Sequence, residues 1–312
     1  MKKKGSRPLP GKRMIVLQTS QKSIGLLCAV LAALFFSAMT AFVHLAGDLP
    51  SMQKALFRNL PALALTAVLL KRRGIPYAVD RPNWGNMAGR CIAGTTGLIC
   101  NYYAIDRLVL ADANMLNKLS PFFAILFSYF LLKEKIRPAQ AAGVLAAFCG
   151  ALLIIKPSLD FSAFFPAFMG VIGGLGAGLA YTFVRRMGKT GEPGLRIVFY
   201  FSLFSCLVTF PFFLIAGKHM ASWQFWCLMA AGVCGAGGQF SITRAYIYAP
   251  ARELSVYEYT QILFAALWGF FLFGQVPDWM SLLGYIIIIG SAVVMFFYNN
   301  QLGPFRPKKA AE

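Results

Sequence analysis

The sequence predicts an all-α integral membrane protein with ten transmembrane helices, arranged as two inverted five-helix repeats. Three observations lead to this prediction. Hydrophobic residues make up 58% of the 312 residues and charged residues only 13%, whereas an average soluble domain is about 25% charged. The apolar residues form whole segments rather than one face of each segment. The stretch 94–143 also aligns without a gap on 235–284.

A helix that crosses a bilayer needs roughly 20 mostly apolar residues. Ten stretches meet this requirement, at about 24–46, 53–70, 87–105, 110–132, 139–155, 165–184, 196–216, 223–246, 253–273 and 279–298. The loops between them are short, and 157–164 is the natural boundary between the two halves. The chain therefore divides into an N-terminal basic tail (1–22), a first five-helix repeat (23–156), a second five-helix repeat (165–298) and a C-terminal tail (299–312).

The distribution of Lys and Arg predicts the orientation. With the N-terminus in the cytoplasm, twenty-one Lys and Arg fall in cytoplasmic segments and four in outer ones. Cytoplasmic loops of membrane proteins carry this excess of positive charge. We therefore expect both tails to be cytoplasmic, in a multi-pass protein of the plasma or inner membrane.

The repeat predicts an inversion, because an odd number of helices per repeat makes the second copy enter the membrane from the opposite side. The aligned loops agree with it. The first copy has Lys133, Lys135 and Arg137 in a loop predicted to be cytoplasmic, whereas the second has no positive charge at 274–278, in a loop predicted to be outside.

Several classes of function are disfavoured. The net charge of +19 is spread between apolar segments, whereas a nucleic-acid binder gathers its Lys and Arg on one face, so nucleic acid is not an expected partner. The seven cysteines form no CxxC pair and there are two histidines, which predicts no metal site and no cofactor. The sequence contains no phosphate-binding glycine loop.

Two runs of residues resemble a known family. The run LVLADANMLNKLSP at 108–121, followed by LLKEK at 131–135, resembles the first EamA-type repeat of the drug/metabolite transporter superfamily. The run RAYIYAPA at 244–251, then YEYT at 257–260 and FGQVPD at 273–278, resembles the second. The resemblance covers roughly 23–298, with one departure: Gln275 stands where the family usually has glutamate.

The resemblance implies a ten-helix structure with a central cavity that moves small organic solutes, such as amino acids, amines or related metabolites. The leading hypothesis is a secondary-active transporter that works by alternating access. A passive channel or facilitator is the second class, although no ring of repeated charges or filter motif is present. An enzyme is not expected, because no nucleophile–base pair or metal cluster is seen. A receptor or scaffold would not explain the inverted duplication.

Charged residues within apolar segments are the main candidates for substrate binding, because a charge in hydrocarbon normally faces a cavity or a partner. Lys118 shares a helix face with Asn114 and lies beside Asn117, and Pro121 one turn later frees a backbone carbonyl. Lys118 would anchor a carboxylate; the alternative is a lysine that extends to the outer interface.

Glu258 and Arg58 are the other charged candidates. Glu258 would neutralise a cationic substrate or carry a proton, and the alternative is a structural ion pair with Lys118 or Arg244. Arg58 would bind a carboxylate with two hydrogen bonds, or equally anchor its helix at the outer interface.

Aromatic and glycine residues complete the candidates. Tyrosines and a tryptophan within the predicted spans would line a cavity and offer stacking surfaces. The alternative is that they pack against other helices. The residues are Tyr103, Tyr257, Tyr259 and Trp268, and also Tyr102 and Tyr181. Gly170, Gly174 and Gly178 lie four apart on one helix and predict close packing within the chain, with a dimer interface or sliding contact as the alternative.

Overall fold

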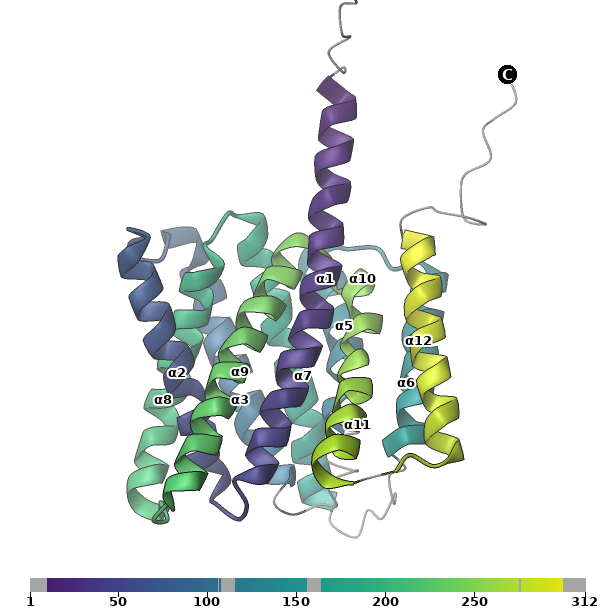
Figure 1. The fold of residues 1–312 in the computed structure, drawn as a ribbon. Coiled ribbons are helices and arrows are strands. Elements are labelled where there is room, and N and C mark those ends of the chain that lie inside the picture. Colours follow the sequence, from purple (N-terminus) through teal and green to yellow (C-terminus); the bar gives the residue numbers. More distant parts are fainter. Residues whose placement is uncertain (1–9, 106, 108–115, 156–163, 275, 300–312) are drawn as a thin grey trace, which may run out of the picture.

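The computed structural model describes residues 10–105, 107, 116–155, 164–274 and 276–299 (Figure 1). Every regular element in these residues is a helix. The long helices are α1 (Pro10–Leu45), α2 (Ser51–Arg72), α3 (Trp84–Ile105), α5 (Ser120–Leu132), α6 (Pro138–Ile155), α7 (Phe164–Lys189), α8 (Gly194–Ala216), α9 (Ser222–Tyr248), α11 (Thr260–Phe273) and α12 (Trp279–Asn299). The short ones are η1 (Arg81–Asn83) and α10 (Ala251–Glu258).

Most predicted spans correspond to one helix, with ends that differ by a few residues. Two differ more. The first helix begins at Pro10 rather than near 24, so it continues into the predicted tail. The ninth span, predicted as continuous over 253–273, is divided at Tyr259 into α10 and α11. The predicted boundary at 157–164 lies, except for its last residue, outside the described residues.

The two repeats have a helix interruption at the same place. Lys118 and Leu119 are non-helical just before α5, and Tyr259 is non-helical between α10 and α11. Lys118 aligns with Tyr259 in the duplication. Around both interruptions the backbone bonds shorten to three residues, from the Leu119 nitrogen to the Leu116 oxygen and from the Tyr259 nitrogen to the Val256 oxygen. Such interruptions leave backbone carbonyls free for other donors.

Helices of one repeat pack mainly on helices of the other. α1 packs on α9, α3 on α7, α2 on α8 and α6 on α12. In the duplication, α7 is the counterpart of α1, and α9 is the counterpart of α3. When each helix is replaced by its counterpart, the α1–α9 contact becomes the α7–α3 contact. The pattern is therefore that of two copies related by an approximate two-fold axis.

Small residues allow α7 to approach its neighbours closely. A Cβ atom added to Gly174 would lie 2.8 Å from the Leu116 carbonyl oxygen, and one added to Gly178 would lie 2.7 Å from the Ala124 nitrogen. A Cβ atom at Gly170 would contact the Leu116 side chain. The face predicted for packing thus lies against α5 and the residues just before it.

The surface of the bundle is apolar where the helices face outward. Many large hydrophobic side chains are exposed, among them Ile92, Leu145, Leu207, Val233 and Ile286. Five helices of the described chain are long and apolar enough to cross a membrane, and α5 and α6 are shorter apolar helices. Apolar exposure on this scale is not found on soluble monomers and fits a lipid environment.

Candidate solute cavity

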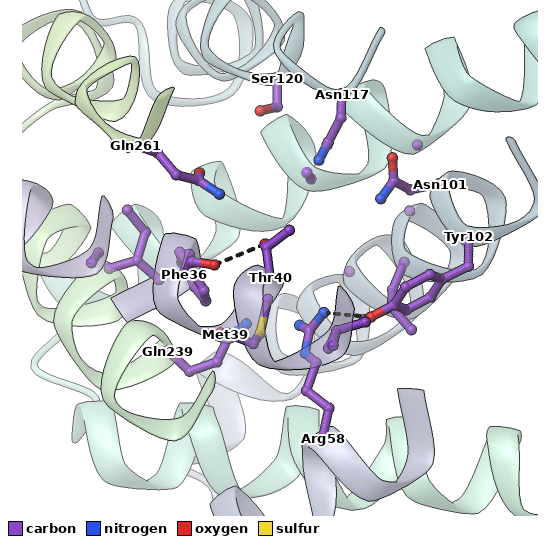
Figure 2. A pocket seen from close by; sticks show the side chains of 18 of the residues that line it. Phe36, Met39, Thr40, Arg58, Asn101, Tyr102, Asn117, Ser120, Gln239 and Gln261 are labelled. Atoms are coloured by element: carbon purple, nitrogen blue, oxygen red, sulfur yellow. Dashed lines mark hydrogen bonds between the residues drawn. The ribbon is translucent and has the colours of Figure 1, made fainter. Parts of the chain in front are cut away.

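A cavity of about 520 Å³ lies between the two repeats. Its walls come from α1, α2, α3, α5, α7, α8 and α9, and from residues next to both helix interruptions. Its polar lining is mixed in chemistry and includes Thr40, Arg58, Arg90, Asn101, Tyr102, Asn117, Lys118, Ser120, Tyr181, Gln239, Glu258 and Gln261. Figure 2 shows part of this lining from close by. The volume is in the range of about 300–1,000 Å³ that small-molecule sites occupy.

The cavity reaches solvent at one end of the bundle, here called the mouth end, where residues 46–50 connect α1 to α2. Gly47, Asp48 and Lys54 belong to its lining there, and the Asp48 side chain is fully exposed. From the mouth end the lining continues inward to Lys118, Glu258 and Gln261. The cavity therefore ends at the depth of the two helix interruptions.

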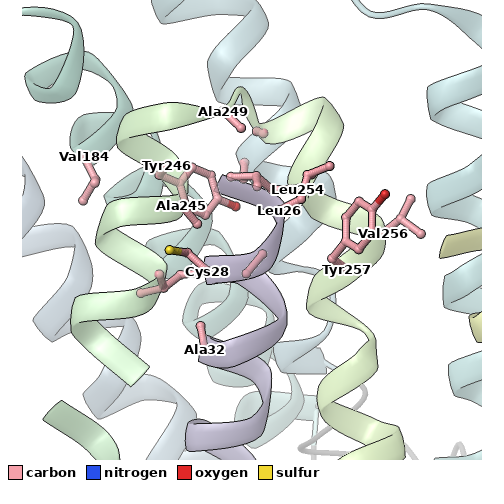
Figure 3. Packing of buried hydrophobic residues seen from close by; sticks show 14 of the residues in the cluster. Leu26, Cys28, Ala32, Val184, Ala245, Tyr246, Ala249, Leu254, Val256 and Tyr257 are labelled. Carbon is pink, nitrogen blue, oxygen red and sulfur yellow. The ribbon is translucent and has the colours of Figure 1, made fainter. Parts of the chain in front are cut away.

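A packed apolar cluster fills the opposite end, here called the closed end, where α9 turns into α10. Leu26 of α1, Tyr246 of α9, and Leu254 and Val256 of α10 are all at most 5% exposed (Figure 3). Figure 3 shows Leu26, Tyr246 and Leu254 close together between α1, α9 and α10, with Val256 on the other side of α10 beside Tyr257. None of these four residues belongs to the cavity lining.

Polar contacts join the two repeats across the closed end. Glu134, after α5, accepts hydrogen bonds from Arg185 at 3.2 Å and pairs with Lys189 at 2.8 Å, both on α7. Lys22 of α1 pairs with Glu253 of α10 at 3.3 Å. Each of these contacts would have to break if the closed end opened.

The deep end of the cavity is organised by the interruptions. The Tyr259 hydroxyl donates to the Lys118 carbonyl oxygen at 2.9 Å, so one interruption uses the carbonyl freed by the other. The Lys118 ammonium donates to Gln261 at 2.8 Å. The Tyr246 hydroxyl donates to Glu258 at 2.5 Å, and the Tyr246 ring stacks on Tyr181 with centroids 4.8 Å apart.

The two arginines of the cavity come from different helices. Arg58 of α2 donates to the Tyr102 hydroxyl at 3.3 Å (Figure 2). Arg90 of α3 donates to Gln239 at 3.2 Å, and its guanidinium lies over the Phe201 ring at 3.9 Å. Arg90 is only 2% exposed.

Four of the predicted binding residues meet in the cavity: Arg58, Asn117, Lys118 and Glu258. Lys118 and Glu258 form no ion pair with each other. Their bonds go to Gln261 and Tyr246 instead. Asn114 lies outside the described residues.

The four aromatic candidates are not part of the cavity lining. Tyr257 is buried in the apolar cluster, and Tyr259 is fully buried, with its hydroxyl on Lys118. Tyr103 contacts Phe165 and lies beneath the Arg107 guanidinium. Trp268 donates to the Ser37 hydroxyl at 3.1 Å. The aromatic rings that do line the cavity include those of Tyr102 and Tyr181.

Sequence reasoning did not single out Arg90, Asn101, Gln239 and Gln261. Arg90 lies within α3, and a Cβ atom at Gly94 would collide with its guanidinium, so this glycine leaves space for it. Amides such as Gln239 carry no charge, so they do not stand out in an apolar stretch. The sequence did hold one signal for them, their spacing from the glycines of the repeat. Arg90 and Asn101 each lie four residues from such a glycine, and Gln239 follows Gly238 directly.

The lining offers ammonium, guanidinium, amide, hydroxyl and carboxylate groups suited to binding a polar solute. In the described part of the chain, no group of three or more His, Cys, Asp and Glu residues could hold a metal ion. A cavity with a polar lining inside an apolar helix bundle built from two related halves is typical of one class of protein, the polytopic membrane transporters.

The chain belongs to the EamA-like transporter family, whose model matches it twice, at residues 23–156 and 164–297. It is therefore a membrane transporter of small solutes. It is 33% identical to the pseudopaline exporter of Pseudomonas aeruginosa over 273 residues, which cover 87% of this chain and 95% of that protein.

More distant relatives also match over most of this chain. Human solute carrier family 35 member G1 is 27% identical over 86% of this chain and 78% of its own length. The riboflavin transporter of Vibrio cholerae is 26% identical over 90% of this chain and 94% of its own. One crystal structure has the same fold, with a TM-score of 0.80 at 17% identity, covering 89% of this chain and 98% of that one.

Proposed function

We propose that this chain is a secondary-active transporter that moves small organic metabolites across the plasma or inner membrane by alternating access. Ten helices would span the bilayer as two inverted repeats, with both termini in the cytoplasm. The observation that carries the proposal is a cavity open at the mouth end and closed at the other by contacts between the repeats. In this orientation the mouth end faces outward.

The symmetry of the fold supports the movement. Because the two interruptions are equivalent and meet at one depth, the arrangement at the closed end has a counterpart at the mouth end that the chain can adopt. Rocking of two inverted halves about such a site is a general transport mechanism. The substrates for which two relatives are named, pseudopaline and riboflavin, support an organic solute.

The test is counterflow in proteoliposomes. Vesicles loaded with one unlabelled solute receive the labelled form outside, over a panel of amino acids, amines, nucleoside-like metabolites and carboxylates. We expect a transient accumulation of label and a rate that saturates with concentration, because a carrier returns loaded faster than empty. Empty liposomes are the control.

A passive channel is distinguished in the same assay. It would let the label equilibrate without any transient accumulation. If no solute on any gradient entered faster than in empty liposomes, the proposed function would be wrong.

We further propose that Glu258 links transport to protons. The groups around it are Tyr246 of α9, Lys118 before α5, and Tyr181 of α7. Glu258→Gln keeps the shape and can still accept the Tyr246 bond, but it cannot release a proton. We expect the variant to retain counterflow and to lose the response of its rate to a pH gradient.

Glu253→Gln is the matched control, since Glu253 is on the same helix but pairs with Lys22 and is not part of the cavity lining. It should keep the pH response. Full pH-dependent transport by Glu258→Gln would remove the proton role.

A further inference from the structure

We propose that the substrate is an organic anion and that its carboxylate binds between Arg58 and Arg90. The inference rests on the proposed transport function, and it names the class of solute that the cavity would accept.

The balance of charge in the cavity favours an anion. Among the described residues that line it, four are Lys or Arg and two are Asp or Glu. Of the two acids, Asp48 is at the exposed mouth end, so Glu258 alone opposes three cations at depth. A charge held in a low-dielectric space strongly favours a neutralising partner.

Arg90 is the best-defined element of the anion site. None of the ion pairs in the described chain includes Arg90, and its buried Nε has no hydrogen-bond partner there. One face of the guanidinium is covered by Phe201, and one amino group is used by Gln239. A buried guanidinium without a counter-charge is costly, and a bound carboxylate would supply both the charge and the missing acceptor.

Arg58 completes the site from the facing helix. Arg58 and Arg90 line the same cavity and repel each other electrostatically, and among the described residues Arg58 has the neutral Tyr102 hydroxyl as its one side-chain hydrogen-bond partner. Two unneutralised guanidiniums that face one cavity repel each other less when an anion lies between them.

The repeat glycines make room for these arginines. A Cβ atom at Gly94 would collide with the Arg90 guanidinium, and one at Gly235 would lie 3.3 Å from the Arg58 Cγ. Gly94 and Gly235 align in the duplication. The same position in each repeat thus gives space to one arginine of the pair.

A cationic substrate fits the cavity less well. Glu258, the acid that would attract it, is bonded to Tyr246 and interacts electrostatically with Lys118. The rest of an anionic solute would meet neutral groups. One of them, the buried Asn101 oxygen, has no donor in the described chain, so it can accept a hydrogen bond from a hydroxyl or amino group of the solute.

The experiment uses three probes with the same five-carbon skeleton: glutarate, its neutral diamide and 1,5-diaminopentane. Thermal unfolding of the purified full chain is followed at matched pH and ionic strength. We expect a saturable rise of Tm with glutarate only, because a ligand stabilises the state that binds it. Arg58→Gln and Arg90→Gln should each weaken the apparent glutarate affinity about tenfold or more.

Arg186→Gln is the matched control, since it removes one positive charge at an exposed position outside the cavity; its glutarate affinity should equal that of the wild type. Should Arg90→Gln fail to fold, Arg58→Gln and the ranking of the probes on the wild type decide the matter. The proposal is overturned if the diamide or the diamine stabilises the wild type as well as glutarate, or if neither arginine variant weakens glutarate.

Counterflow with the same three probes tests the anion site and the transport function separately. Transport of the diamine but not of glutarate would contradict the anion site and leave the transporter in place. Glutarate binding that depends on both arginines, without transport of any solute, would leave the anion site and contradict the proposed function.

Discussion

Replacing Glu192 with glutamine is expected to lower the free energy of unfolding by about 3–5 kcal/mol. The Glu192 side chain is fully buried and accepts a hydrogen bond from Arg196 at 2.7 Å on one oxygen and from Asn83 at 2.9 Å on the other. Arg196 is 4% exposed. Without the carboxylate, its guanidinium stays buried, and Asp80, at 4.0 Å, is the one other carboxylate of the described chain that pairs with it.

Unfolding of the purified protein by a denaturing detergent or by heat measures the effect. Asp80→Asn is the matched control, because it removes the other carboxylate near Arg196. The Asp80 side chain is 69% exposed. A surface pair of this kind contributes about 0–1 kcal/mol. Equal losses in the two variants would contradict a dominant role for the buried pair.

Gly178→Ala should destabilise the protein by about 1–3 kcal/mol, toward the upper value. The new Cβ atom would lie 2.7 Å from the Ala124 nitrogen and 2.8 Å from the Ser120 oxygen. Both are backbone atoms of α5, so no side chain can rotate away and the two helices must separate. Since α7 forms part of the cavity wall, transport should fall together with Tm.

Gly290→Ala provides the comparison on α12, where a Cβ atom would meet nothing within 4 Å. An alanine in a helix restricts the unfolded chain more than a glycine, so this variant should be stabilised by roughly 0.4–1 kcal/mol. A Gly178→Ala protein as stable as Gly290→Ala would show that the α5–α7 contact is loose.

Helix positions follow from the sequence because the length of an apolar segment is a local property. The predicted span 196–216 and α8 (Gly194–Ala216) differ by two residues at one end. The interruption at Tyr259 could not be predicted in this way. No proline or glycine lies within 251–268, and the bond from the Tyr259 hydroxyl to Lys118 depends on the approach of a distant segment.

The cavity was predictable where charge marked it. Lys118 and Glu258 stand out because ionised groups are rare in apolar segments, and both line the cavity. Aromatic residues carry no such mark: Tyr257 and Tyr181 are equally compatible with packing and lining, and only the tertiary structure separates them. The hydrogen bond by which Gln239 orients Arg90 also forms between two helices, α3 and α9, so it depends on the tertiary structure.

The pairing of α1 with α9 has a consequence for biosynthesis. Ribosomes add about 5–20 residues per second, so roughly 10–35 s pass between completion of Leu45 and arrival of Ser222. During that interval Phe35 and Phe36 have no Gly237 and Gly238 to pack on. The first half therefore has to be kept in the membrane with an unfinished interface. The interface between α1 and α9 can form only after the second half of the chain has been made.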